Sequence, residues 1–390
     1  MATGLAGTIA VPSSVLGAGD RVRVGVIGAG ERGIQLAREV LACGNTQVTG
    51  FADIYPRRLE SAKSVAPAAS LLSDYRSLLE DPEVDAVVVA TPPHLHAEHV
   101  LASLDAAKHV YVEKTMAFTV DQARQMRAAA GRAPSLVVQV GHQWCSSGLY
   151  AGAERFLSAG GMGKVTAIHA HMYRNSPRGK PQWSRPVYPD MTPEAIAWEA
   201  FLGASSRCEF DANRYVNWRF FWDYSGGSVF ENMSQQLAFW YKALDLQIPV
   251  AASMLGGVHL WQDGREVPDT MSVAMEHSEE ILFSWDSGFG NNQLGASEEV
   301  LGTDGTISRG QQIRYLPQKV NRPDGVESLS QARTQPNAHM HDFLECIRTG
   351  KTPNCPVELG YRVSVACRMA VESYRQGRTV RWDPIREEIL

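Results

Sequence analysis

The sequence VGVIGAGERG, residues 24–33, runs from an apolar β-branched segment into three glycines with the spacing GxGxxG. Glycines at this spacing are weak evidence alone, but here they follow a predicted strand and open a predicted helix. Gly28 permits a tight turn, Gly30 lets a pyrophosphate approach the backbone, and Gly33 lets helix and strand pack closely. The free N–H groups at the start of such a helix attract phosphate. The segment therefore predicts a dinucleotide-binding unit.

An acidic residue, Asp53, lies 20 residues beyond Gly33, at the end of the next predicted strand. A carboxylate there binds the ribose hydroxyls of NAD and repels the 2′-phosphate of NADP. Arg57 and Arg58 follow closely and weaken this preference. We therefore expect NAD as the cofactor, with NADP less favoured.

Short β-branched runs alternate with helical patterns between residues 21 and 140. Predicted strands cover residues 21–27, 47–53, 86–90, 109–112 and 136–140, and predicted helices cover 34–41, 57–64, 97–106 and 120–130. The connections are short and contain Gly or Pro, as βα units require. The pattern predicts an α/β class domain with a doubly wound parallel sheet.

The pattern changes after residue 141. Segments 165–173, 271–276 and 280–285 alternate apolar and polar residues, as half-buried antiparallel strands do. Helical patterns at 341–348 and 363–376 close the chain. We expect four parts, namely a flexible tail or export-signal remnant (1–20), a Rossmann domain that binds NAD (21–140), an α+β domain with a large, mostly antiparallel open sheet for substrate binding and oligomerisation (141–375), and a C-terminal tail (376–390).

The composition is that of an ordinary folded protein. Of 390 residues, 44% are hydrophobic and 20% charged, and the formal net charge is −5. Nucleic acid and anionic membranes attract clustered positive charge, so neither is an expected partner. No segment reaches the roughly 18 apolar residues of a transmembrane helix. The compartment stays open between cytoplasm and, if residues 1–20 are a trimmed twin-arginine signal, periplasm.

Six cysteines lie far apart, without a CxxC pair. This spacing indicates neither a zinc site nor a disulfide framework. We expect all six to be buried thiols of a protein that folds under reducing conditions.

A second cofactor segment follows the predicted strand at 86–90. Thr91 and Pro92 stand where open α/β sheets place their ligands. Three histidines come next, but no acidic or thiol partner is fixed nearby to complete a metal site. We expect His96 beside the nucleotide, and His94 and His99 on the surface.

These segments together give the chain a family resemblance. The order GAGERG, then ATPPHLH at 90–96, then Val112-Glu113-Lys114, then a long sheet domain resembles the Gfo/Idh/MocA family of glucose–fructose oxidoreductase and inositol dehydrogenase, over roughly residues 21–385. Parts of the second domain are similar to NAD-dependent glycosidases of the same superfamily. The resemblance implies that Lys114 lies beside the nicotinamide and touches the substrate hydroxyl, although Thr115 replaces the family's proline.

The resemblance also identifies a second catalytic element, which in the family ends D-x-x-x-H at a helix start. The matching segment, 225–235, has Glu231 in place of the Asp and Gln235 in place of the His. An amide cannot take a proton from a substrate hydroxyl. The base is then Lys114, Glu231, a tyrosine such as Tyr173 or Tyr224, or a chain of waters.

The motifs and the resemblance together imply three sets of site residues and no metal. The catalytic set is Lys114, Gln235, Glu231 and Tyr173. The cofactor set is Gly28, Gly30, Glu31, Arg32, Gly33, Asp53, Arg58, Thr91, Pro92, His96, Glu113, Lys114 and Gln143. The substrate set is His142, Trp144, Arg174, Asn175, Trp183 and Arg219.

Three functional hypotheses remain. The first is an NAD-dependent oxidoreductase that acts on a secondary hydroxyl of a sugar or glycoside. The second is a glycosidase that oxidises its sugar, eliminates the aglycone, adds water and returns the hydride, so that NAD is not consumed. The third is a protein that senses NAD or a sugar without turnover, because fold alone never secures function. We expect a homo-oligomer, a dimer or tetramer, because a broad sheet face of this kind seldom stays bare.

Overall fold

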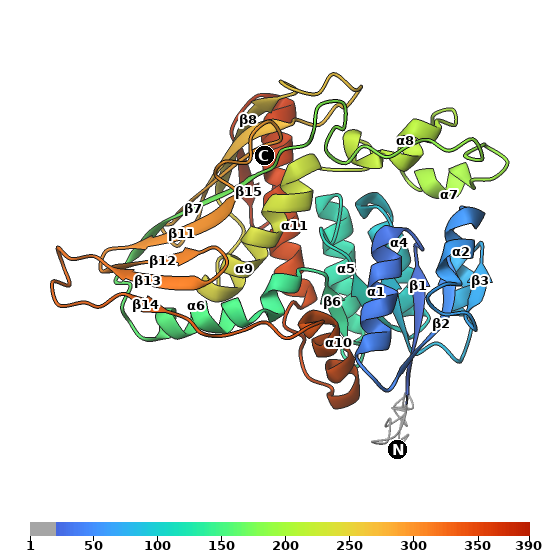
Figure 1. Ribbon diagram of the computed structural model, residues 1–390, viewed down its shortest axis with the longest axis horizontal. Coiled ribbons are helices and arrows are strands. Elements are labelled where there is room, and N and C mark those ends of the chain that lie inside the picture. The colour runs from blue at the N-terminus through green and yellow to red at the C-terminus, as the bar shows by residue number, and fades with distance from the viewer. Residues whose placement is uncertain (1–20) are drawn as a thin grey trace, which may run out of the picture.

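The computed structural model describes residues 21–390, and the predicted N-terminal tail lies outside this range. Two sheets with helices between and around them form the molecule (Figure 1). The first sheet, on the right of Figure 1, and the second, on the left, are separated by α9 and α11. No helix in the described range is both long and apolar enough to cross a bilayer.

The first sheet has six parallel strands in the order β3-β2-β1-β4-β5-β6. Its strands are β1 (Val22–Ile27), β2 (Thr46–Ala52), β3 (Ser70–Leu72), β4 (Ala86–Val89), β5 (His109–Val112) and β6 (Val138–Val140). Its helices are α1 (Glu31–Ala42), α2 (Pro56–Ala62), α3 (Tyr75–Leu79), α4 (Pro93–Asp105) and α5 (Val120–Arg132). This confirms the predicted doubly wound sheet, to which the structure adds the short β3 and α3.

The second sheet has ten strands in the order β14-β13-β12-β11-β7-β10-β9-β8-β15-β16. They are β7 (Val165–Tyr173), β8 (Ala251–Gly257), β9 (Thr270–Glu276), β10 (Leu282–Gly288), β11 (Ala296–Gly302), β12 (Gly305–Arg309), β13 (Ile313–Pro317), β14 (Ser328–Leu329), β15 (Val380–Asp383) and β16 (Glu388–Ile389). The sheet is mostly antiparallel, as predicted. However, β10 pairs with β7 in parallel, because an alternating pattern encodes which face is buried and not the strand direction.

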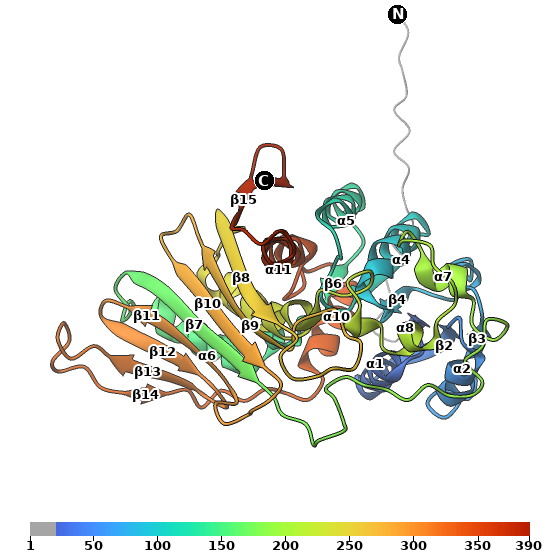
Figure 2. The same ribbon diagram turned by 90° about the horizontal axis from the view of Figure 1, so that it is seen from above.

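Within residues 21–390, helices cover only one face of the second sheet, as Figure 2 shows from above. These are α6 (Gly148–Ser158), α9 (Ser234–Leu244) and α11 (Val357–Gln376). Their buried side chains belong to one apolar cluster that runs from Val112 of β5 through Trp240 of α9 to Trp285 of β10. The two sheets therefore share a core, which fixes the cleft between them.

Two C-terminal segments depart from simple domain boundaries. Helix α10 (Ala338–Thr349) returns to the first sheet, where Phe343 and Leu344 pack in one cluster with Val22 and Val24 of β1. The expected C-terminal tail contains β15, which pairs with β8 at one side of the second sheet. Both segments bury apolar side chains against parts of the chain that are distant in sequence.

Residues 183–224, which we call the cap, form a third small unit with its own apolar cluster. It contains α7 (Trp198–Leu202), α8 (Ala212–Val216) and the short turn η2 (Trp218–Phe220). In Figure 1 it lies above α2 and α4, over the first sheet. Tyr55, from the first domain, packs within this cluster.

Candidate functional site

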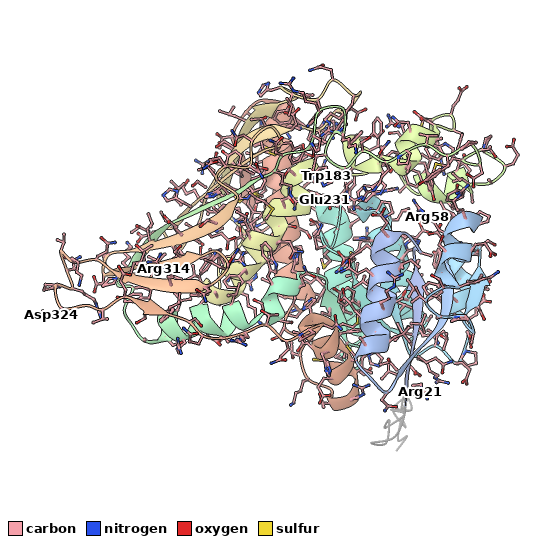
Figure 3. The ribbon with its side chains drawn as sticks, viewed as in Figure 1. Arg21, Arg58, Trp183, Glu231, Arg314 and Asp324 are labelled. Carbon is pink, nitrogen blue, oxygen red and sulfur yellow. The ribbon has the colours of Figure 1, made fainter. Side chains whose placement is uncertain are left out.

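A cavity of about 1280 Å³ lies between the carboxyl ends of the first sheet's strands and the cap. One end, which we call the nucleotide end, is lined by the glycine-rich loop and by residues after β2 and β3. The other end, which we call the substrate end, is lined by Trp183, Trp218, Arg219 and Glu231. In Figure 3, Trp183 and Glu231 are labelled close together between the two sheets, and Arg58 lies farther to the right, near α2. The cavity exceeds the roughly 300–1,000 Å³ of ordinary small-molecule sites, so it has room for a dinucleotide and a substrate.

The glycine-rich loop has the predicted geometry. Gly28 has a positive φ of 94°, and a Cβ on Gly33 would lie 1.9 Å from the Gly28 carbonyl oxygen. A Cβ on Gly30 would meet only the Arg58 guanidinium carbon, at 4.0 Å, so the loop faces open space there. Gly30 precedes α1 with no side chain capping the helix N-terminus. These free N–H groups beside the cavity fit a pyrophosphate.

The carboxylate of Asp53 is buried behind this loop. It accepts hydrogen bonds from the backbone N–H groups of Ala29 (2.8 Å) and Tyr55 (2.9 Å). Burial raises its pKa, and the Arg58 guanidinium, 3.9 Å away, opposes that rise. Arg58 in turn stacks on the ring of Tyr215 in the cap, at 4.8 Å. Asp53 thus holds the glycine-rich loop in place through its hydrogen bond with Ala29.

Polar contacts join the cap to the first domain across the cavity. The carboxylate of Asp190 accepts hydrogen bonds from the Tyr55 hydroxyl and from two nitrogens of Arg57, each at 2.7 Å. Arg185 pairs with Glu31 at the start of α1, also at 2.7 Å. The cap therefore closes one side of the nucleotide end.

The substrate end is built around Glu231, which lies in η3 (Val229–Met233), a π-helical turn that leads into α9. Its Oε2 contacts both the Lys114 ammonium (3.0 Å) and Nε of Arg219 (3.3 Å). Burial alone raises the pKa of Glu231, but the charges of Arg219 and Lys114 outweigh burial and lower it to about 2. Glu231 is therefore ionised at any working pH and is a weak base.

A group of buried polar atoms without partners lies beside Lys114. His142 is fully buried, and neither of its ring nitrogens has a hydrogen-bond partner within residues 21–390. Burial and the charge of Lys114 lower the pKa of His142 to about 3, although the nearby Gln235 side chain acts in the opposite direction. Oε1 of Gln235 is also buried and unpartnered. Such atoms have hydrogen-bonding capacity left for a ligand or a water.

Two further predicted residues hold the Lys114 loop in place. Glu113 accepts hydrogen bonds from Arg32 Nε (2.8 Å) and from the backbone N–H of Lys114 (3.2 Å). The ring of buried His96 bridges two carbonyl oxygens, those of Thr91 (2.8 Å) and Thr115 (3.0 Å). His96 thus ties the loop after β4 to the loop after β5 and does not line the cavity.

The surface prediction for His94 and His99 is wrong, because the cap and α3 cover α4. His94 contacts the carbonyl oxygen of Phe201 in the cap at 2.7 Å, and His99 contacts the Thr91 hydroxyl at 3.0 Å. Burial lowers their pKa values to about 4 and about 3. The cysteine prediction is also partly wrong, since Cys208 is exposed and Cys43 is only half-buried.

Several predicted residues are not brought to Lys114. Tyr173 lies on the face of β7 opposite the buried Met172, with its ring beside that of His171, at 6.0 Å between centroids. Tyr224 is buried inside the cap, against His94. The exposed Asn175 accepts a hydrogen bond from the N–H of its neighbour in sequence.

The remaining substrate and cofactor candidates are spread around the cleft. Trp144 packs under the guanidinium of Arg309, and the preceding Gln143 is exposed. Trp183 lines the cavity with its ring against Phe289. Arg174 donates from Nη2 to Oδ1 of Asn232, next to Glu231, at 3.0 Å.

Sequence reasoning missed Arg185 and Tyr215 of the cap, which line the cavity, and Asp190, which contacts Arg57. Asp190 and Arg57 are 133 residues apart in sequence, so no local sequence pattern predicts their contact. The cap is also poor in periodic helix or strand patterns, because its helices are five residues long or shorter. No group of three or more potential metal ligands gathers within residues 21–390.

Two protein-family models match the chain. Residues 22–142 match "Oxidoreductase family, NAD-binding Rossmann fold" and residues 204–381 match "Oxidoreductase family, C-terminal alpha/beta domain", the two parts of the Gfo/Idh/MocA family. Together they include most of the chain, and the first identifies the Rossmann domain as one that binds NAD(P).

Curated relatives match the N-terminal part. The chain is 34% identical over 152 residues to a 1-carboxy-3-chloro-3,4-dihydroxycyclohexa-1,5-diene dehydrogenase of Comamonas testosteroni, covering 39% of this chain and 38% of that protein. It is 33% identical over 156 residues to inositol 2-dehydrogenase 2 of Saccharopolyspora erythraea, covering 40% and 46%. The chain thus matches less than half the length of each relative.

A solved structure of levoglucosan dehydrogenase, in complex with NADH and levoglucosan, is similar over nearly the whole fold. The TM-score is 0.71, with 93% of this chain and 99% of that chain covered. The sequence identity is 19%, so this likeness supports the fold alone.

Proposed function

Because the chain belongs to the Gfo/Idh/MocA oxidoreductase family, we propose that it is an NAD-dependent dehydrogenase that oxidises a secondary hydroxyl of a sugar-like substrate. The relatives named above are dehydrogenases of a dihydroxycyclohexadiene and of inositol. Both names describe a ring with hydroxyl-bearing carbons, and we propose that this chain oxidises a carbon of that kind. The glycosidase subgroup has no support from these relatives.

The observation that carries the proposal is the contact between Lys114 and Glu231 at 3.0 Å. Lys114 follows the last residues of β5 in the first domain, and Glu231 precedes α9 in the second. Glu231 lines one end of a cavity whose other end fits a dinucleotide. A reacting group at the domain junction, beside the carboxyl ends of parallel strands, is the expected place for catalysis in such folds.

Asp53 favours NAD over NADP in this proposal, because its buried carboxylate repels a 2′-phosphate. Gly30 and the start of α1 bind the pyrophosphate through backbone N–H groups. When bound, the nicotinamide accepts hydride from the substrate carbon. No other cofactor is needed to balance the reaction, since the substrate loses a hydride from carbon and a proton from oxygen.

Lys114, an ammonium paired with Glu231, donates a hydrogen bond to the substrate hydroxyl oxygen, and the hydroxyl proton leaves through a chain of waters. Glu231, with a pKa of about 2, is too weak a base for this step and instead holds the Lys114 side chain in place. His142 and Gln235 supply buried hydrogen-bonding groups for a second hydroxyl or a water beside Lys114. In place of the family's histidine, this chain has His142 and Gln235, which orient the substrate and do not change protonation near neutral pH.

The test is NADH formation from a panel of inositols, levoglucosan and simple pyranosides, with NAD and NADP compared. We expect NADH to form with NAD in preference, and Lys114→Met to lower kcat by at least about 100-fold. Binding of NADH, measured by its fluorescence, should survive in that variant. Lys63→Met is the matched control, because Lys63 is exposed just after α2 and, within residues 21–390, pairs only with Glu60.

Two outcomes would contradict the proposal. Aryl glycosides that release aglycone in large excess over trace NAD, without net NADH, would indicate the redox-neutral glycosidase. Tight NADH binding with no turnover of any substrate would indicate a sensing protein.

A further inference from the structure

The substrate end of the cavity carries an excess of positive charge. Two cationic side chains, Lys114 and Arg219, contact the carboxylate of Glu231, and a third, Arg174, donates a hydrogen bond to the neighbouring Asn232. The four charged groups sum to two positive charges, within a chain whose formal net charge is −5. Local charge against the trend of the whole molecule attracts a ligand of opposite sign.

Arg219 presents its guanidinium to the cavity with donors to spare. Its Nε contacts Glu231 at 3.3 Å, and its plane stacks on the ring of Trp218 at 4.1 Å. No residue in the described part of the chain accepts a hydrogen bond from its two terminal nitrogens, and its side chain is 34% exposed. Both Arg219 and Trp218 line the cavity wall. A guanidinium that is held at Nε and stacked on one face offers its terminal nitrogens as a rigid fork.

Such a fork matches a carboxylate better than a neutral hydroxyl. Two parallel N–H groups bind the two oxygens of a carboxylate in a bidentate pair, which is among the strongest hydrogen-bonded contacts in proteins. A hydroxyl uses only one of them and leaves the excess charge uncompensated in a partly enclosed site. Phosphate groups are more often cradled by backbone N–H groups at a helix N-terminus, which this cavity offers at its nucleotide end.

We propose that the substrate carries a carboxylate, bound by Arg219, so that the oxidised compound is a sugar acid or a similar hydroxylated ring acid. The inference rests on the proposed function for the oxidation of a ring hydroxyl, and it adds the chemical class of the substrate. Lys114 binds the reacting hydroxyl, Trp218 and Trp183 flank the ring, and Arg219 fixes the acid group. The carboxylate takes no part in the redox step.

The test compares acids with their neutral amides on the same ring. The cofactor-loaded protein is titrated by calorimetry with D-glucuronate and D-galacturonate, and with the corresponding amides. NADH formation is measured with the same compounds and with glucose 6-phosphate. We expect acids to be preferred over amides by about 10- to 100-fold, the usual effect of a charge-assisted pair.

Three variants make the test specific. Arg219→Met should bring the ratio of acid to amide close to one, and Arg219→Lys should retain part of it, because the charge remains while the fork is lost. Arg178→Met is the matched control, since Arg178 is exposed in the segment between β7 and α7 and is not part of the cavity wall. The control should leave the ratio unchanged.

The outcomes separate this inference from the proposed function. Neutral sugars oxidised as well as acids, or a preference that survives Arg219→Met, would overturn the carboxylate assignment and leave the dehydrogenase intact. A preference for glucose 6-phosphate over glucuronate would also overturn it. Selective binding of acids without NADH from any compound would support the acid site and overturn the dehydrogenase.

Discussion

The two ends of the cavity are built in different ways. The nucleotide end uses mainly the backbone of contiguous residues, with glycines at positions where a Cβ would collide or intrude. The substrate end uses side chains from distant parts of the chain, and Lys114 and Glu231 meet across 117 residues. The first kind of site depends on local conformation, and the second depends on how two domains dock.

This difference predicts how each end fails. A single methyl group at the wrong glycine should destroy the nucleotide end, because backbone atoms cannot move aside. Loss of one charge at the substrate end should leave a folded protein with a poorly aligned site. The cap, which contacts the first domain through exposed ion pairs, should respond least.

The largest effect is expected from Gly33→Ala. The new Cβ would lie 1.9 Å from the Gly28 carbonyl oxygen, so α1 must move away from the loop. We expect a loss of about 3 kcal/mol or more in the free energy of unfolding and no measurable NADH binding. Urea unfolding and NADH fluorescence measure these two quantities.

Gly30→Ala is the matched variant. Its Cβ meets only the Arg58 guanidinium carbon at 4.0 Å, so the apo protein should unfold at nearly the wild-type urea concentration. NADH affinity should still fall by at least about 10-fold, because the methyl group occupies space that the pyrophosphate needs. Wild-type affinity in Gly30→Ala would show that the cofactor does not approach the backbone here.

The same contrast explains how much the sequence could predict. The strands of the first sheet follow the predicted ranges to within one or two residues, as 21–27 against Val22–Ile27 illustrates. Buried parallel strands are continuous apolar runs, which are easy to recognise in the sequence. The glycine spacing predicts the turn between β1 and α1. β3 escaped prediction because three residues carry no periodicity.

The substrate end was predictable only in part. Family motifs pointed to Lys114 and Glu231, which the structure brings into contact, while their catalytic roles stay a prediction. Tyr173 fell on the outer face of β7, because a residue's side of a sheet depends on strand register and not on nearness to a motif. The burial of His94 depends on the cap, whose contact at Phe201 lies 107 residues away.

The second effect, at the substrate end, is expected from Glu231→Gln. Lys114 and Arg219 then repel each other without the shared carboxylate, so we expect a fall in kcat of about 10- to 100-fold. Because the pKa of Glu231 is lowered from an ordinary 4.5 to about 2, its ionised form stabilises the fold by about 3 kcal/mol at neutral pH. NADH binding should change little, which separates the two ends.

The pH dependence gives this prediction a sign. A carboxyl with a depressed folded pKa contributes its full stability above its unfolded pKa, and the contribution is lost as pH falls through the folded value. The difference between wild type and Glu231→Gln in urea unfolding should therefore be constant from pH 7 to about 5 and shrink from pH 4.5 towards 2. A difference that persists unchanged at pH 3 would contradict the ion-pair assignment.

The smallest effect is expected where the cap meets the first domain. Hydrogen bonds from Arg57 and Tyr55 lower the pKa of Asp190 to about 2, so the carboxylate stays ionised and holds both partners. Asp190→Asn weakens this link without changing the cavity lining elsewhere. If cofactor exchange requires the cap to lift from α2, NADH should dissociate about two- to five-fold faster in stopped-flow displacement.

Glu60→Gln, which removes a surface pair with Lys63 confined to the α2 region, should leave the rate unchanged. Equal dissociation rates in Asp190→Asn and wild type would mean that the nucleotide end opens without the cap, and that the two ends of the cavity are independent in motion as well as in construction.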